Sequence, residues 1–123
     1  MLLQLSFLNF QMADSVKQNF DPSDVELSRM ARSIAHPIRI MILRKLAETN
    51  AALGSEEIKA MPMAPSTVIQ HLRDLKKAGL VKGKIFGSNA KFWLVQEQLE
   101  RIIDSWTSIS ELLHDHPEKS RKQ

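Results

Sequence analysis

The stretch from Pro65 to Trp93 constrains the fold most, because a charged helix runs directly into a short hairpin. Its first part, PSTVIQHLRDLKKAG, has helical periodicity and ends at Gly79, a residue typical of helix ends. The helix face that should be buried carries Val68, Leu72 and Leu75. Two runs rich in β-forming residues, LVKGKIF and AKFWLV, flank a turn at residues 87–89. The segment therefore predicts a helix packed beside a β-hairpin.

Three further helices are predicted before this segment. In FDPSDVE, Asp21 can cap a helix and Ser23 with Glu26 can form a capping box, so residues 23–35 should form an amphipathic helix. A second, largely buried helix should begin after His36, whose role we expect to be at that helix start. The run SEEIKAM predicts one or two more turns with Ser55 as N-cap, followed by a hinge at PMAP.

The last predicted helix, residues 97–114, carries an apolar stripe that a domain of this length cannot cover completely. Part of the stripe should pack on its own chain. The remainder predicts a homodimer formed by this helix and the helix of Met30, with residues 7–10 adding contacts. The predicted interface residues are Met30, Leu99, Ile102, Ile103, Trp106, Ile109 and Leu113.

Composition indicates one domain with a local basic region. The chain has 123 residues, 43% of them hydrophobic, and a formal net charge of only +3. Residues 66–91, however, contain six cations and one anion, which gives this segment +5 and leaves −2 for the rest. A basic patch on a nearly neutral protein favours a polyanionic partner.

The order of the predicted elements is typical of a winged helix-turn-helix: two helices, a short helix, a helix with a polar face and a hairpin. The expected fold class is mainly α with a small β-hairpin (α+β), homodimeric through its terminal helices. The second helix of such a unit lies in the major groove of double-stranded DNA. Gln70 can pair with adenine, Arg73 can reach guanine or phosphate, and the hairpin can follow the backbone. The predicted DNA-binding residues are Ser66, Thr67, Gln70, His71, Arg73, Lys77, Lys84, Ser88, Asn89 and Lys91.

Other functions find less support in the sequence. No cysteine is present, which excludes disulfides and thiolate metal sites and is compatible with a cytoplasmic protein. No nucleophile stands with an activating base and no glycine loop could hold phosphate, so neither an enzyme nor a cofactor is predicted. Two alternatives stay open: a winged helix that binds protein instead of DNA, and a metal sensor built on His114, Asp115, His116 and Glu118.

Three stretches resemble ArsR-type repressors. Their alanine–histidine–proline–x–arginine opening resembles the stretch ARSIAHPIRIMILRKLAE. Their recognition helix, with its His-Leu pair and its Ala-Gly-Leu-Val end, resembles the stretch STVIQHLRDLKKAGLV. GSNAKFWL is similar to their wing tip and returning strand. The resemblance spans about residues 25–113 and implies a homodimeric transcriptional repressor of bacteria or archaea.

Two departures from the family pattern bear on function. Ala64 stands where the family often has a serine cap. The paired cysteines of its metal-sensing members are absent from SEEIKAMPM, and Asp104 lacks the histidine two residues later that the last-helix metal site would need. We therefore expect no metal site, with an organic ligand, a partner or protein abundance left open as the signal.

The ends of the chain are expected to lie outside the domain. Residues 1–22 predict an N-terminal extension that packs in the dimer or is partly disordered, and its apolar opening could also precede a start at Met12. It lacks a cationic start and the length of a membrane span, so neither a signal peptide nor membrane attachment is predicted. The domain should occupy residues 23–114 and a flexible tail residues 115–123.

Overall fold

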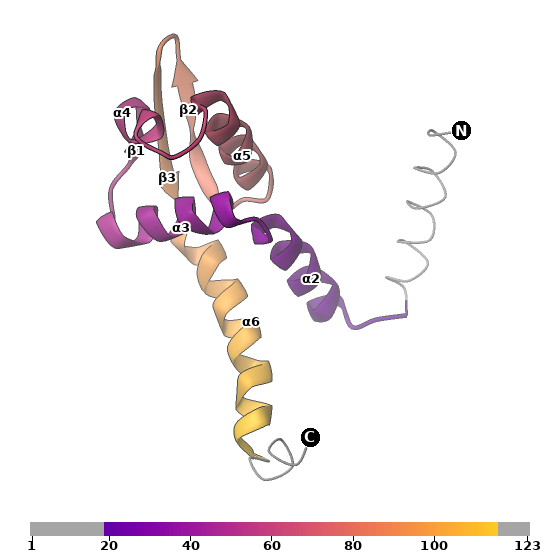
Figure 1. Ribbon diagram of the computed structural model, residues 1–123. Coiled ribbons are helices and arrows are strands. Elements are labelled where there is room, and N and C mark those ends of the chain that lie inside the picture. Colours follow the sequence, from indigo (N-terminus) through magenta and orange to yellow (C-terminus); the bar gives the residue numbers. More distant parts are fainter. Residues whose placement is uncertain (1–18, 116–123) are drawn as a thin grey trace, which may run out of the picture.

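The computed structural model describes residues 19–115. It is mostly helical with one small antiparallel sheet, and the elements are α2 (Pro22–Ile34), α3 (Pro37–Thr49), β1 (Leu53–Gly54), α4 (Ser55–Lys59), α5 (Pro65–Lys77), β2 (Val81–Phe86), β3 (Asn89–Leu94) and α6 (Gln96–Asp115) (Figure 1). The sheet has the order β1-β3-β2, so a third strand joins the predicted hairpin. The expected winged helix-turn-helix order and the mainly α fold with a small β-hairpin are confirmed.

The first two helices begin at side-chain caps. The Asp21 carboxylate accepts hydrogen bonds from the Ser23 amide at 2.9 Å and the Ser23 hydroxyl at 2.7 Å, so the helix starts one residue earlier than predicted. The expected capping box of Ser23 and Glu26 is wrong, because Asp21 engages the serine hydroxyl. His36 caps α3 through its Nδ1, which accepts from the Ile38 amide at 3.2 Å, in agreement with its expected place.

Ser55 does not cap α4 as predicted. Gly54 holds the N-cap position, and its amide donates to the Glu57 carboxylate at 3.0 Å. Pairing of β1 with β3 brings Ser55 beside the hairpin instead. There its hydroxyl accepts from the Ala90 amide at 2.8 Å and donates to the Ser88 carbonyl at 3.3 Å. The side chain thus ties α4 to the hairpin.

The core lies between α2, α3, α5, the sheet and the first turns of α6. Its buried side chains are Met30, Ile42, Leu43, Leu46, Leu53, Ile58, Met61, Val68, Leu72, Leu75, Leu80, Val81, Ala90, Phe92 and Ile102. Val68, Leu72 and Leu75 are fully buried, as their helical spacing predicts. The buried face of α5 therefore fixes which of its residues face outward.

The hairpin is closed by two residues, Gly87 and Ser88, since Asn89 already pairs with Phe86. The predicted turn at 87–89 is one residue too long. Gly87 has φ 54°, the positive value that the first central residue of a type II′ turn requires. Gly83 in β2 has φ 149°, and a Cβ there would lie 2.1 Å from the Lys91 carbonyl oxygen across the ladder. Glycine at position 83 therefore allows the two strands to approach.

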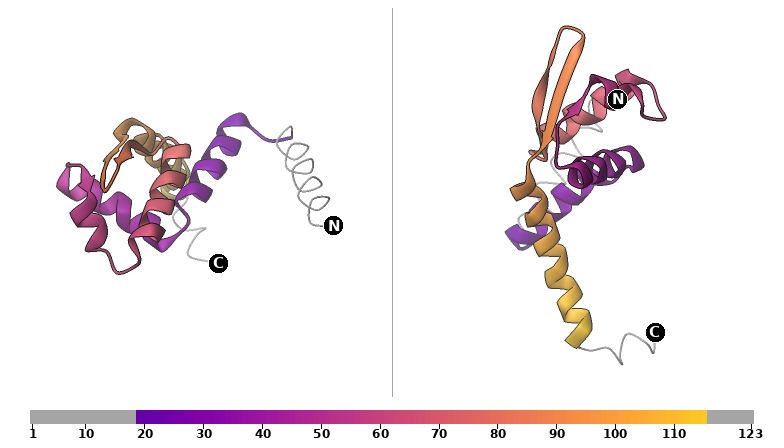
Figure 2. Two further views of the ribbon diagram at one scale, coloured as in Figure 1. Left: turned by 90° about the horizontal axis from the view of Figure 1, so that it is seen from above. Right: turned by 90° about the vertical axis from the view of Figure 1, so that its left-hand side faces the viewer.

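Helix α6 leaves the compact part of the fold and extends away from the hairpin tip (Figures 1 and 2). Its first half lies beside α2, and Leu99 and Ile102 pack on the core there. Its second half extends past α2 with apolar side chains exposed. Among residues 19–115, no helix has both the length and the apolar character needed to cross a membrane.

Candidate nucleic-acid interface

The outer face of α5 is the first part of the candidate interface. Ser66, Thr67, Gln70, Arg73 and Lys77 are all exposed on the side away from the buried residues of this helix. Ala64 at the N-cap provides no side-chain hydrogen bond, as its residue type predicts. The positive end of the α5 dipole is thus not neutralised by a capping carboxylate, which suits an approaching phosphate.

Gln70 is held by a chain of polar contacts that begins on α3. Its amide nitrogen donates to one carboxylate oxygen of Asp74 at 3.3 Å. The other Asp74 oxygen accepts from the Arg39 guanidinium at 2.8 Å, an ion pair in which the two side chains are 19% and 29% exposed. The same guanidinium donates to the Ser33 carbonyl at the end of α2 at 2.8 Å. The orientation of α5 is therefore coupled to α2 and α3.

His71 lies at the junction of α5 and α3, where its Nδ1 accepts from Arg39 Nε at 3.1 Å. Its ring centroid is 4.4 Å from that of His36. Partial burial, followed by electrostatic interactions with His36 and Arg39, lowers the pKa of His71 below its usual value of 6.5, and the nearby Asp74 carboxylate opposes this effect. The ring therefore takes part in the packing of α5 against α3.

The hairpin carries the second part of the candidate interface. Lys84 and Lys91 are directly opposite each other across the ladder, and both are exposed. Ser88 and Asn89 lie at the tip, although the Ser88 carbonyl is engaged by Ser55. Lys84 Nζ stands 4.7 Å from the centre of the Phe86 ring, which helps to hold the ammonium group on this face.

Sequence reasoning missed several residues that build the interface. The pairing of Arg39 with Asp74 could not be predicted from the residues around either position. The contact between Gln70 and Asp74 could have been predicted, because they have the i, i+4 spacing at which helical side chains meet. Lys76, counted in the basic segment, donates to the Gly83 carbonyl at 2.6 Å and links α5 to β2. These polar contacts thus help to hold α5 against α3 and β2.

The predicted dimer residues fall into two groups. Met30 and Ile102 are buried in the core of the single chain and Leu99 is partly buried, so they offer little surface to a partner. The other four predicted residues are exposed: Ile103 near the middle of α6, and Trp106, Ile109 and Leu113 on its second half. Leu112, which the prediction omitted, is exposed beside them. Trp106 is 64% exposed, an unusual state for the largest apolar side chain.

The residues of the alternative metal cluster are only partly described. His114 and Asp115 lie in the last turn of α6, whereas His116 and Glu118 fall outside the described residues. Within residues 19–115, no three His, Asp or Glu side chains are grouped closely enough to hold a metal ion.

Comparison with known proteins places this geometry in a family. The model of the bacterial regulatory protein family arsR matches residues 36–82. An HTH-type transcriptional regulator of Methanocaldococcus jannaschii is 32% identical over 72 residues, covering 58% of this chain and 81% of that protein. The HTH-type transcriptional repressor SmtB of Mycobacterium tuberculosis is 32% identical over 74 residues, covering 60% of this chain and 54% of that protein.

Solved structures show the same fold. An ArsR-like transcriptional regulator from Rhodococcus sp. RHA1 matches with a TM-score of 0.61 at 16% identity, over 83% of this chain and 95% of the other. A homodimeric winged helix-turn-helix domain, Mb0332 of Mycobacterium bovis, matches with a TM-score of 0.51 at 23% identity, over 74% and 85% of the two chains. With its match to the family model and to these curated regulators, the chain belongs to the ArsR family of winged helix-turn-helix transcriptional regulators.

Proposed function

We propose that this regulator is a homodimeric repressor that binds a specific DNA site in the cytoplasm of a prokaryotic cell. The observation that carries the proposal is the two-sided character of α5, with three fully buried apolar residues on one side and five exposed polar or basic residues on the other. A helix that only stabilised the fold would not need Gln70 and Arg73 side by side on a basic outer face. The opposing lysines of the hairpin add charge beside it.

The two elements would contribute differently to binding. In the proposed complex, Ser66, Thr67, Gln70 and Arg73 contact base edges or phosphates in the major groove, and Lys77 contacts the backbone. Lys84, Lys91, Ser88 and Asn89 contact the neighbouring backbone from the hairpin. His71 supports α5 from behind, consistent with its bond to Arg39. Base preference should therefore depend on α5, and salt-dependent affinity on both elements.

Single substitutions test this division of labour in a mobility-shift assay on DNA fragments selected by the wild-type protein. Gln70→Ala should cost about 1–3 kcal/mol on the best site and flatten the preference at one or two base pairs. Lys84→Ala should weaken binding to all sequences alike and reduce the salt slope by about 0.9, because one phosphate would no longer be neutralised. Arg101→Ala, which removes an exposed charge from α6, serves as control and should change neither quantity.

The opposite pattern would contradict the assignment. If Gln70→Ala left every base preference intact while Lys84→Ala altered one, the hairpin would be the element that selects bases. If the wild-type protein had no salt-dependent affinity for duplex DNA, the alternative of a protein-binding winged helix would be favoured instead.

The proposed dimer uses the exposed second half of α6. Trp106 and Leu113 on this half, with Ile103 just before it, form an apolar surface whose side chains are 52–64% exposed. The homodimeric Mycobacterium bovis domain of the same fold supports pairing of this kind. A two-fold dimer would place two copies of α5 on one side of the duplex, so the operator should be an inverted repeat with half-sites about 34 Å apart.

Sedimentation tests the dimer directly. The wild-type protein should sediment as a dimer at micromolar concentration, and Trp106→Glu should shift the mass towards the monomer because it would bury an unpaired charge. Thr107→Glu, on the same turn and also exposed, is the matched control and should remain dimeric. A wild-type monomer at this concentration would exclude the proposed interface.

The inducing signal is proposed to be something other than a thiol-bound metal, since the chain has no cysteine. An organic effector, a partner protein and control by abundance all remain candidates. The competing hypothesis, a metal sensor that uses His114 and His116, has its own test. Stoichiometric zinc would release the wild-type protein from DNA, and the double change to alanine would abolish that release.

A further inference from the structure

The outward face of the hairpin carries aromatic side chains as well as charged ones. Three cross-strand pairs lie on it, each with both members exposed: Lys82 with Trp93, Lys84 with Lys91, and Phe86 with Asn89. Because side chains alternate along a strand, these six share one face, and Val81, Ala90 and Phe92 are buried on the other. The face therefore combines three cations with two large aromatic rings and contains no carboxylate.

Both aromatic rings are partly exposed, and the Lys84 ammonium lies beside the Phe86 ring. Phe86 is 46% and Trp93 is 40% exposed. Together with Lys82, Gly83 and Lys84 they line a shallow hollow of about 550 Å³. Phe86 is four positions after Lys82 in β2, and Lys82 is paired with Trp93, so the two rings are about 14 Å apart along the hairpin at ~3.4 Å per residue. Two rings at this separation, with lysines between them, form an elongated surface.

A duplex backbone would use the lysines of this face but not the rings. Paired bases in duplex DNA stack on each other and present only their edges, so their faces are not available to Phe86 or Trp93. A protein partner is also less suited, because lysine is depleted at the centre of protein interfaces. Unpaired bases offer flat apolar faces together with a phosphate chain, which matches aromatic rings interleaved with cations.

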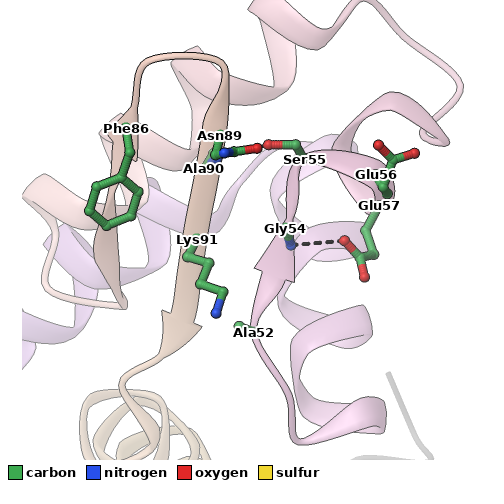
Figure 3. Close-up of a pocket in the computed structure, with 9 residues that line it drawn as sticks. All are labelled: Ala52, Gly54, Ser55, Glu56, Glu57, Phe86, Asn89, Ala90 and Lys91. Atoms are coloured by element: carbon green, nitrogen blue, oxygen red, sulfur yellow. Dashed lines mark hydrogen bonds between the residues drawn. The ribbon is translucent and has the colours of Figure 1, made fainter.

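We propose that this face, formed by Lys82, Lys84, Phe86, Lys91 and Trp93, binds single-stranded nucleic acid by stacking unpaired bases on the two rings. The lysine ammonium groups neutralise the phosphates between them. The strand runs along the β2 side of the hairpin, where Lys82 and Lys84 lie. The hollow on the β1 side, which Phe86 and Lys91 also line, is rimmed by the carboxylates of Glu56 and Glu57 of α4 (Figure 3). This site is additional to the duplex contacts of α5, and it shares Lys84 and Lys91 with the duplex contacts proposed for the hairpin.

Intrinsic fluorescence reports on the proposed stacking. The chain has two tryptophans, so a Trp106→Phe background leaves Trp93 as the single fluorophore. Titration with an oligothymidine or oligouridine of about eight nucleotides, within the ~4–16 that single-strand sites span, should quench Trp93 and saturate. Comparison of the DNA and RNA oligonucleotides shows which polymer is preferred, and binding should weaken as salt increases.

Variants separate stacking from simple charge. Trp93→Ala, followed by anisotropy of labelled oligonucleotide, should weaken single-strand binding about 5- to 150-fold, the cost of removing one stacked base. Phe86→Ala at the exposed tip should act in the same direction. Ile85→Ala is the matched control, since Ile85 is 38% exposed but lies on the opposite face of the same strand. Thermal melting checks that all three variants fold.

Measuring duplex binding and single-strand binding on the same variants distinguishes this proposal from the proposed function, on which it does not depend. Gln70→Ala should impair binding to the selected duplex and leave oligothymidine binding unchanged, whereas Trp93→Ala should do the reverse. Absence of oligonucleotide binding or of Trp93 quenching would overturn the proposal. So would an equal loss of duplex and single-strand affinity in Trp93→Ala, or equal quenching by a polyglutamate peptide, which would indicate an acidic protein partner.

Discussion

The ion pair between Arg39 and Asp74 should contribute measurably to stability, and its contribution can be predicted from the geometry. The two groups are 2.8 Å apart, and their side chains are only 19% and 29% exposed. Fully exposed pairs contribute about 0.2–1 kcal/mol, and breaking a fully buried pair costs about 3–5 kcal/mol. Hydrogen bonds to charged groups contribute about 1.5–3 kcal/mol. We therefore expect a coupling free energy of about 1.5–2.5 kcal/mol.

A double-mutant cycle isolates this pair from the other bonds of Arg39. The single variants Arg39→Met and Asp74→Asn and the double variant are unfolded with urea at one fixed protomer concentration, because dimerisation makes apparent stability depend on concentration. Arg39→Met alone should cost more than the coupling energy, since it also removes the bonds to the Ser33 carbonyl and to His71.

The exposed pair of Arg29 and Glu26 provides a matched control. Its atoms are 3.5 Å apart, and its side chains are 56% and 54% exposed, so its coupling should not exceed about 0.5 kcal/mol. A coupling of Arg39 with Asp74 no larger than that of the control would refute the argument that partial burial strengthens this contact. It would also remove the reason to regard Asp74 as a support for Gln70.

Three further outcomes are expected. Gly83→Ala should lower the free energy of unfolding in urea by about 1–3 kcal/mol, because the new Cβ would meet the Lys91 carbonyl oxygen. A variant as stable as the wild type would contradict the close approach of the strands. Leu72→Ala should cost about 2–5 kcal/mol and leave base preference in the shift assay unchanged, since the side chain is fully buried. The pKa of His71 in the folded state is below 6.5, so the unfolded chain binds the proton more readily. The contribution of this group to stability is therefore complete above about pH 6.5 and is lost as pH falls through the folded pKa. His71→Gln should reduce this dependence of the melting temperature on pH.

The sequence alone determined the helices, the hairpin and the exposed side of α5. These features follow from interactions between residues close together in the chain: apolar side chains three or four positions apart, a proline or aspartate at a helix start, and a glycine in the turn. The predicted boundaries of α2 and α6 differ from the observed ones by a single residue at each end. The exposure of Gln70 and Arg73 followed from the burial of Leu72 and Leu75 on the other side of the same helix.

Only the tertiary structure decided which side chains connect these elements to one another. Arg39 meets Asp74 across 35 positions of sequence, and Ser55 meets Ala90 across another 35. Strand β1 has two residues, too few for any alternation to be recognised, and it forms because β3 offers a free edge. Met30 could not be assigned to core or dimer from its helical spacing, because that spacing identifies an apolar face but not what covers it. Local periodicity fixes the direction of a side chain, whereas its partner is fixed by the packing of elements that are distant in sequence.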